Sequence, residues 1–419
     1  MLKLILPGLQ QMGNYRREFL SGDLSAGLIV AVLLIPQGMA YAMLAGIDPV
    51  IGLYSVTIPL VVYALFASAR QLAVGPVAMV ALLVFSGVSA LAEPGTAQFT
   101  SYVLLLTLMV GIIQFLMGVF RLGFVVHFLS PAVMSGFTSA AAIVIALSQL
   151  KHLLGVPLAN HAYTHQLVLE TVQRLDEAHP LTLAIGLGSI ILWGLIRKIA
   201  PRLPAPLLMV ILSSSVVYLF SLDQRGVSIV GDVPQGFPGF SLPVVDIQSL
   251  KPLLSVALTI SLVGFMESLA VAQRIASKEN YELNANQELR ALGLANIVGS
   301  FFSSMPVTGG FSRTAVNYQA GAKTVLASIL TAFFVILTLL FFTPFFYYLP
   351  HSVLAAIIMT AVYGLIDLKE TKHLFQENRA EGVILVITFL GTLFLGIEQG
   401  LLMGVSASLL KRFLQRLRK

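Results

Sequence analysis

The sequence predicts an all-α polytopic membrane protein, on the evidence of its composition, the length of its apolar runs and the placement of its basic residues. The chain of 419 residues is 57% hydrophobic and only 11% charged, whereas soluble domains carry about 25% charged residues. Its mean hydropathy is +0.90, and apolar runs of bilayer length repeat along the whole chain. A single soluble core could not bury so much apolar surface, so we expect most of it to face lipid.

Fourteen apolar runs are separated by charged residues or by Pro and Gly, and each is interpreted as a transmembrane segment. The third and tenth are short, and Gly-rich or Pro-containing stretches precede them. The predicted segments are 24–44, 51–67, 76–91, 102–120, 129–150, 181–198, 204–221, 252–273, 289–304, 312–320, 324–343, 349–366, 381–396 and 398–412.

Lys and Arg are distributed unevenly between the two sides of this arrangement. With a cytoplasmic N-terminus, 19 of the 25 basic residues fall in inside loops, and 2 more, Arg70 and Arg313, lie at the edges of the short segments. Only 4 fall outside, namely Lys151, Arg174, Arg225 and Lys251. Miscounting one segment would exchange the sides of every later loop, so the bias supports the count. We expect a multi-pass protein of the cell membrane with both termini cytoplasmic.

Several classes of function are excluded by what the sequence lacks. It has no Cys, which removes disulfides, thiolate metal sites and Cys nucleophiles. No phosphate-binding loop, nucleophile triad or zinc-binding helix is present, so we expect no enzyme, metal or cofactor. The basic residues form no patch for nucleic acid. We interpret two polar groups as solvated surface: His152, His161, His165 and His179, and Glu279, Glu282 and Glu288.

An internal repeat relates the two halves of the chain. Residues 66–80 match residues 302–316, and each stretch closes the second segment of its half and opens the short third one. Residues 36–38 lie opposite residues 266–268 in this alignment. Seven segments per half is an odd number, so the second copy must cross the membrane inverted, as in secondary transporters. The predicted repeats are about 20–221 and 250–415 of a single transport domain.

In such folds the two short helices begin near the midplane and direct their N-termini toward each other. The free N–H groups and the positive dipole end of each helix create a site for an anion. Pro76 suits the first helical position, and Gly75 allows the backbone to approach closely. Ser312 is expected to cap the tenth segment, beside the fixed positive charge of Arg313.

Four polar or charged side chains belong to the candidate site. Arg313 beside a buried helix start calls for an anion, although pairing with Glu267 to hold the halves together is an alternative. Glu267 lies within an apolar segment and suits a proton-coupled or cation-coupled role, or else a structural ion pair. Gln37, in a first segment broken at Pro36, can donate amide N–H groups to an oxyanion or satisfy a helix kink. Tyr41 is a pocket wall or a packing residue.

These residues also carry a family resemblance. Residues 35–46 have the sequence IPQGMAYAMLAG, and together with the segments below they resemble the sulfate permease (SulP) anion transporter family along essentially the whole chain. The matching segments are Pro49, Gly52–Tyr54, Pro59, Tyr63–Ala64, Val74–Pro76, Leu129–Val133, Gly136–Phe137, the surroundings of Glu267, and Thr308–Arg313.

The resemblance implies a core domain (segments 1–4 and 8–11), a gate domain (5–7 and 12–14), elevator-like movement of one against the other, and a homodimer in the bilayer. Family members usually continue into a cytoplasmic STAS domain, which we expect this chain to lack. The implied substrate positions are Gln37, Tyr41, Gly75, Pro76, Val77, Ala78, Phe311, Ser312 and Arg313, with Glu267 for coupling.

The sequence therefore predicts a secondary active transporter of small anions, coupled to protons or sodium. A sulfate-type oxyanion is the first candidate, and bicarbonate and dicarboxylates also suit the site. A nucleobase–proton symporter of similar fold is an alternative, but Arg313 argues against a neutral substrate. A passive anion channel is a second alternative, which the titratable Glu267 makes less attractive.

Overall fold

The computed structural model describes residues 6–13, 15–128, 130–159, 164–200, 203–366, 368–377 and 379–417. Each of the fourteen predicted segments coincides with a helix, or with two in the case of 51–67, to within a few residues. The all-α class is confirmed. Lys3, Arg202, Arg418 and Lys419, which entered the predicted topology, and His161 lie outside the described residues.

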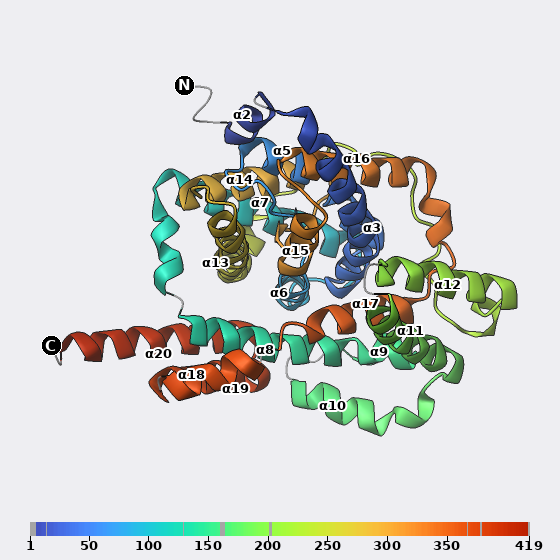
Figure 1. Ribbon diagram of the computed structural model, residues 1–419. Helices are drawn as coiled ribbons and strands as arrows, with labels where there is room; N and C mark the ends of the chain where they lie inside the picture. Colours follow the sequence, from blue (N-terminus) through green and yellow to red (C-terminus); the bar gives the residue numbers. More distant parts are fainter. Residues whose placement is uncertain are drawn as a thin grey trace. The chain divides into compact units, whose positions relative to one another are not determined.

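The chain divides into two compact units. The first comprises Met1–Gly123, Leu195–Leu219 and Ile229–Leu349. Its elements (Figure 1) are α2 (Pro7–Gly13), η1 (Arg17–Phe19), α3 (Leu20–Leu44), α4 (Pro49–Tyr54), α5 (Ile58–Phe66), β1 (Val74–Gly75), α6 (Ala78–Val88), α7 (Ala97–Val119), α12 (Ala205–Phe220), α13 (Ile247–Lys278), α14 (Ala285–Ser300), β2 (Thr308–Gly309), α15 (Phe311–Gln319), α16 (Leu326–Phe341) and η5 (Thr343–Phe346).

The second unit comprises Phe124–Gly194, Phe220–Ser228 and Pro350–Lys419. The 3-10 helix η2 (Leu122–Phe128) crosses from the first unit into it. Its other elements are α8 (Pro131–Ser148), α9 (Leu150–Leu154), α10 (Thr164–Gln173), η3 (Leu175–Glu177), α11 (Pro180–Ile199), η4 (Asp223–Arg225), α17 (His351–Tyr363), α18 (Leu368–Glu377), α19 (Arg379–Phe394) and α20 (Ile397–Leu417).

This division follows the expected core and gate with one exception. All eight predicted core segments lie in the first unit, and five of the six gate segments lie wholly or mainly in the second. The exception is α12, the seventh segment, which the resemblance assigns to the gate and which belongs to the first unit instead.

Ten helices among the described residues have the apolar composition of membrane segments. Six are long enough to cross a bilayer, in the ranges Arg17–Leu44, Pro49–Phe66, Ala97–Val119, Pro131–Leu154, Pro180–Ile199 and Gln248–Lys278. Four are shorter: Ala78–Val88, Ala205–Phe220, Leu326–Phe341 and His351–Tyr363. The first of these four is the predicted short third segment.

Glycines bring the helices of the first unit into close contact. A Cβ added to Gly52 of α4 would lie 2.0 Å from the backbone oxygen of Gly38 in α3. Likewise, a Cβ on Gly293 of α14 would lie 2.4 Å from the backbone nitrogen of Phe115 in α7. Small residues at such crossings let helix backbones approach in membranes, where van der Waals packing drives association. These close contacts fix α4 against α3 and α14 against α7.

The sequence suggested a first segment broken at Pro36, but the structure shows no break there. Helix α3 runs without interruption from Leu20 to Leu44 with Pro36 inside it. Pro36 is buried, and α3 packs against α4, α6, α15 and α16. A proline removes one backbone hydrogen bond from a helix, and neighbouring helices compensate for that loss within a membrane protein.

Candidate functional site

The two halves of the chain meet in a short antiparallel pair of strands that the sequence did not predict. Val74 of β1 pairs with Gly309 of β2, and Gly75 pairs with Thr308. The backbone N–H of Gly310 then donates to the carbonyl oxygen of Ala73 over 3.0 Å. Each strand leads within a few residues into a short helix, so the pairing brings the starts of α6 and α15 together, between α3 and α13 (Figure 1).

The helix starts differ from those predicted. Helix α6 begins at Ala78 with Val77 in extended conformation before it, so Pro76 precedes the helix and does not open it. Helix α15 begins at Phe311 after Gly310, so Ser312 lies inside the helix and is not its cap. Phe311 is therefore equivalent to Ala78 and not to Gly75, its partner in the sequence alignment.

Both helix starts keep their leading N–H groups free of side-chain caps. Neither Val77 nor Gly310 makes a side-chain hydrogen bond to the helix that follows it. The first backbone N–H groups of a helix have no partner within the helix, and the helix dipole makes this end electropositive. Val77 and Ala78 are each only 6% exposed. Two uncapped helix starts, of which that of α6 is buried, suit an anionic ligand.

Arg313 lies at the centre of this arrangement. Its side chain is 2% exposed, and its Nη1 donates to the carbonyl oxygen of Pro76 over 2.7 Å. Nε and Nη2 are buried and have no hydrogen-bond partner. A guanidinium has five N–H donors, and a buried cation without an anionic partner is costly. Nε and Nη2 are therefore available to donate hydrogen bonds to an anion.

Two glycines make space for the guanidinium. A Cβ on Gly310 would lie 2.6 Å from Nη2 of Arg313 and 2.7 Å from its Cζ. A Cβ on Gly75 would lie 2.9 Å from Val56 and 3.6 Å from the same Nη2. Contacts below 3.0 Å force something to move, so Gly310 is required for this position of Arg313.

Glu267 and Tyr41 complete the charged environment, from α13 and α3. The charges of Arg313 and Glu267 act on each other, and both act on the Tyr41 hydroxyl. In the part of the chain that the structure describes, however, no ion pair or hydrogen bond links Arg313 to Glu267, and Oε2 of Glu267 is buried without a partner. The alternative in which the two form a structural ion pair is therefore not what the structure shows.

Of the remaining predicted residues, Gln37 is buried, whereas Phe311 and Ser312 are exposed. Gln37 is 9% exposed, one turn before Tyr41 on α3, and its Oε1 is buried without a partner. No side-chain hydrogen bond from Gln37 to the helix backbone occurs among the described residues, so it does not satisfy a kink. Phe311 is 47% exposed, with the guanidinium of Arg274 over its ring at 5.4 Å. Ser312 is also exposed.

Hydroxyl groups that sequence analysis missed hold the strands and helix starts in place. Thr314 of α15 accepts from the N–H of Ala73 over 3.0 Å and donates to the oxygen of Gly310 over 2.7 Å. Ser268, next to Glu267 on α13, accepts from the N–H of Gly309 over 2.8 Å. Both hydroxyls are fully buried. Their only signal in the sequence is a small polar residue in an apolar or Gly-rich stretch, which is too common to single them out.

Asn296 fixes the approach to β2 from the other side. Its amide accepts from the N–H of Val307 over 2.8 Å and donates to Oε1 of Gln114 over 3.0 Å. Gln114 in turn donates to the oxygen of Ser261 on α13 over 3.3 Å. This buried network joins α14, α7 and α13 to the strand that carries the site. Such networks specify one arrangement when every member is satisfied.

Two interpretations of polar residues as solvated surface were wrong. Glu288 is 1% exposed and accepts hydrogen bonds from the hydroxyls of Tyr63 and Ser68 and from the N–H groups of Ser68 and Ala69. It thus anchors the segment between α5 and β1. His152 is only partly exposed, and its ring packs against that of His351 with the centroids 5.8 Å apart.

Among the described residues, no group of three or more His, Asp or Glu side chains lies close enough together to hold a metal ion. The donors that converge here are N–H groups and one guanidinium, which bind anions and not cations.

The chain is similar to known proteins along nearly its whole length. Residues 20–388 match the model of the sulfate permease family. The chain is 40% identical over 414 residues to "Sulfate transporter 4.1, chloroplastic" of Arabidopsis thaliana, covering 97% of this chain and 60% of that protein. It is 38% identical over 441 residues to "Low affinity sulfate transporter 3" of Stylosanthes hamata, covering all of this chain and 68% of the relative. The chain thus spans about 60% of the length of the first relative.

Two solved structures share the fold. The structure of SLC26A9 superposes with a TM-score of 0.94 at 27% identity, covering 99% of this chain and 68% of that one. The transmembrane domain of the cyanobacterial bicarbonate transporter BicA superposes with a TM-score of 0.79 at 23% identity, covering 94% of this chain and 98% of that domain. At that identity, the second match concerns the fold alone.

The match to the family model covers most of the chain, and the Arabidopsis and Stylosanthes relatives are aligned along nearly all of it. The family is one of membrane transporters and not of enzymes. The chain is a multi-pass membrane protein that belongs to the sulfate permease family.

Proposed function

We propose that this protein carries a small anion across the membrane, with sulfate as the first candidate. The observation that carries the proposal is Arg313, a 2% exposed guanidinium whose Nε and Nη2 have no partner, beside two uncapped helix starts. A sulfate ion has four oxygens that accept hydrogen bonds from several directions. Backbone N–H groups and an Arg fork are donors that suit such oxyanions.

The choice of anion rests on the relatives. The matched plant proteins carry the printed names of sulfate transporters, and the BicA domain is that of a bicarbonate transporter. Both anions fit the donors at the site, as do small dicarboxylates. Sulfate is preferred because the sequence relatives that cover nearly the whole chain are sulfate transporters.

Glu267 is proposed as the coupling residue of a secondary active mechanism. Its Oε2 is buried without a partner, and an ionisable side chain within a membrane segment is a candidate for ion coupling. A proton taken up by Glu267, or a sodium ion bound beside it, would offset its charge while Arg313 holds the anion. We infer symport of the anion with one of these cations.

Transport is proposed to follow elevator-like alternating access. The site lies wholly in the first compact unit, so movement of that unit would carry the bound anion with it. The two inverted repeats of a single transport domain, a homodimeric assembly, a cell-membrane location and cytoplasmic termini complete the proposal. The bias of basic residues toward one side supports the orientation.

The alternatives differ from this proposal in the substrate that is carried or in the mode of transport. A nucleobase symporter would place a neutral ring at the site, where the buried charge of Arg313 would stay uncompensated. A passive channel would conduct anions without dependence on a cation gradient.

Uptake into proteoliposomes made with the purified full chain tests these possibilities. Radiolabelled sulfate, bicarbonate, a dicarboxylate and uracil are offered with and without an imposed pH or sodium gradient. We expect gradient-dependent uptake of sulfate that Arg313→Ala abolishes, whereas Arg379→Ala, at an exposed position on α19, retains it. Uracil uptake, or sulfate flux that no cation gradient accelerates, would refute the proposal in favour of the corresponding alternative.

A further inference from the structure

The loop of residues 229–245, between η4 and α13, is almost free of polar side chains. Its sequence is IVGDVPQGFPGFSLPVV, in which Asp232, Gln235 and Ser241 are the polar residues and Asp232 is the only charged one. Its prolines carry no backbone N–H, so fewer donors need a partner. Apolar surface left in water costs about 25 cal/mol per Å². A loop of this composition is therefore suited to a surface of low polarity.

Backbone hydrogen bonds hold the 229–245 loop against the ends of two helices of the first unit. The N–H of Gly236 donates to the oxygen of Leu339, in the last turn of α16, over 3.1 Å. The N–H of Ser241 donates to the oxygen of Phe301, directly after α14, over 2.8 Å. Helix α16 has the apolar composition of a membrane segment, so its end marks one surface of the bilayer. The loop is fixed at the level of that surface.

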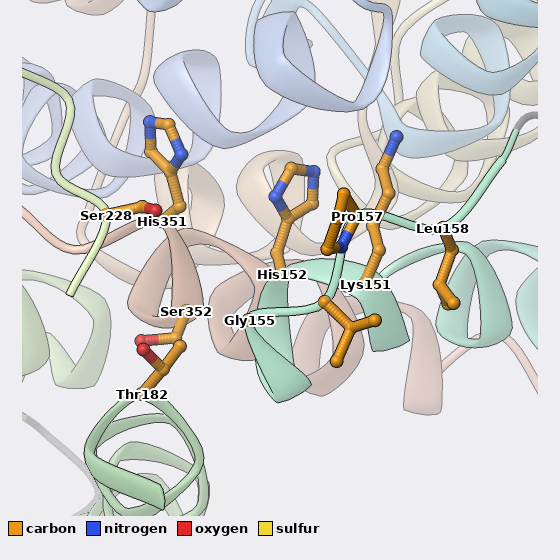
Figure 2. A pocket seen from close by; sticks show the side chains of 10 residues that line it. Lys151, His152, Gly155, Pro157, Leu158, Thr182, Ser228, His351 and Ser352 are labelled. Carbon is orange, nitrogen blue, oxygen red and sulfur yellow. The ribbon is translucent and has the colours of Figure 1, made fainter. Parts of the chain in front are cut away.

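The start of the loop is fixed as well. Ser228 precedes it, and the carbonyl oxygen of Ser228 accepts from the N–H of His351, which lies beside it (Figure 2), over 3.1 Å. The N–H of Gly231 donates to the oxygen of Tyr347 over 3.0 Å. The loop is thus bonded at its start and along its length, and its exposed side chains take defined positions.

Five apolar side chains of the loop are exposed. The ring of Phe240 stacks on that of Phe301 with the centroids 5.8 Å apart, so an exposed ring is held at the end of α14. The five side chains, each at least 49% exposed, are Phe237, Phe240, Leu242, Val244 and Val245.

Exposed aromatic side chains at the end of α16 continue this apolar surface. Phe341, Phe342 and Phe345 are each more than half exposed, and they follow Leu339, to which the loop is bonded. The exposed apolar side chains of a membrane helix face lipid. Because the loop is bonded to the same end of the same helix, it borders the same lipid.

We propose that the 229–245 loop inserts its exposed apolar side chains into one surface of the phospholipid bilayer and anchors this end of the first unit there. Irregular backbone exposed to lipid does not occur within the hydrocarbon core, so the backbone stays among the headgroups while the side chains reach toward the acyl chains. The loop contains no Lys or Arg, so it has no need of anionic lipids.

A fluorescent label inside the loop tests this contact. The chain has no Cys, and a Cβ on Gly239 meets nothing within 4 Å, so Gly239→Cys can carry an NBD label without displacing a neighbour. The full chain is reconstituted in phosphatidylcholine vesicles with plain or brominated acyl chains. Brominated lipid should quench this label severalfold more strongly than a label at Gln224→Cys, an exposed position in η4. Iodide in the water should do the reverse.

Two other outcomes of this measurement would overturn the proposal. If iodide quenched both labels equally and brominated lipid quenched neither, the loop would face water. If neither quencher reached the label at position 239, a protein surface such as a second copy of the chain would cover the loop instead of lipid.

A second measurement tests whether the apolar side chains make the contact. Phe237→Gln and Leu242→Gln are added to Gly239→Cys, which leaves the stacking of Phe240 on Phe301 in place. The label should then lose most of its quenching by brominated lipid. As the control, Asp232→Gln and Ser241→Gln also add two glutamines to the loop, and they should retain the quenching. Equal losses for the two pairs would contradict insertion by the apolar side chains.

Discussion

Arg313 of α15 donates from Nη1 to the carbonyl oxygen of Pro76, 2.7 Å away. This bond joins the start of one short helix to the residue that lies two positions before the other. The protein itself thus fixes the guanidinium, and Nε and Nη2 take no part in holding it there. An anion can then bind without displacing a structural bond, so little reorganisation is needed on binding.

Gly310→Ala tests whether the position of this guanidinium matters. The new Cβ would lie 2.6 Å from Nη2, so the guanidinium of Arg313 must move from its present position. We expect sulfate binding to weaken by about tenfold, equivalent to about 1.4 kcal/mol, in radioligand binding to the purified protein. Gly188→Ala is the control, because a Cβ there meets nothing within 4 Å. Equal affinities for the two variants would show that the guanidinium position is unimportant.

Thr314→Val tests the support of the strand pair. Valine keeps the shape but removes the hydroxyl that accepts from the N–H of Ala73, and leaving that buried donor unpaired costs about 1–3 kcal/mol. We expect lower resistance to denaturant together with weaker sulfate binding. Thr259→Val, whose hydroxyl lies on the exposed side of α13, should change stability by less than about 0.5 kcal/mol. An unchanged unfolding curve for Thr314→Val would contradict this role.

Glu267→Gln separates binding from coupling. The amide keeps the size of the side chain but can neither take up a proton nor offer a negative charge to sodium. We expect the variant to bind sulfate within about twofold of the parent, since a twofold change is only about 0.4 kcal/mol. Its uptake should no longer respond to a pH or sodium gradient across proteoliposomes. Glu282→Gln, in an exposed loop, should respond like the parent. A variant at Glu267 that still follows the gradient would exclude the carboxylate as the coupling group.

Much of this architecture follows from local sequence patterns. A segment such as α7 is apolar over a bilayer length and needs no knowledge of its neighbours, and the cost of burying an arginine singles out Arg313. The β1–β2 pair is different, because it consists of two residues from each half and depends on contacts more than 200 residues apart in sequence. No periodicity can be seen in so short a strand. Because the strands were not predicted, the predicted starts of α6 and α15 differ from the observed ones.

Glu288 and His152 show the same limit for polar side chains. Each follows or precedes a charged or polar stretch, which is typical of solvated loops. Glu288 is nevertheless buried because residues near Ser68, distant in sequence, supply four donors to it. Whether a polar residue is exposed or paired depends on such long-range partners, and a single sequence does not contain them.

Glu288→Gln should therefore destabilise the protein, although the residue takes no part in binding. Glu288 is the acceptor in all four of its hydrogen bonds. The NH₂ group of a glutamine in its place would face at least one N–H or O–H donor. We expect a loss of about 2–3 kcal/mol, the scale of hydrogen bonds to a buried charge, in denaturant unfolding of the detergent-solubilised chain. Glu279→Gln removes a partly exposed carboxylate, 3.6 Å from Lys323, and should cost under about 1 kcal/mol. Similar losses for both would mean that burial of Glu288 contributes nothing.

The absence of Cys from the chain makes the predicted topology directly testable. Single cysteines are introduced at exposed positions, Asp176→Cys in η3 and Ser277→Cys near the end of α13. Under the topology predicted from the basic residues, position 176 lies outside and position 277 inside. In intact cells, a membrane-impermeant maleimide should label the first and not the second, and permeabilised cells should show labelling of both. If positions 176 and 277 were both labelled in intact cells, the number of segments between them would have to differ from the predicted number by an odd number. The two repeats would then not be inverted relative to each other.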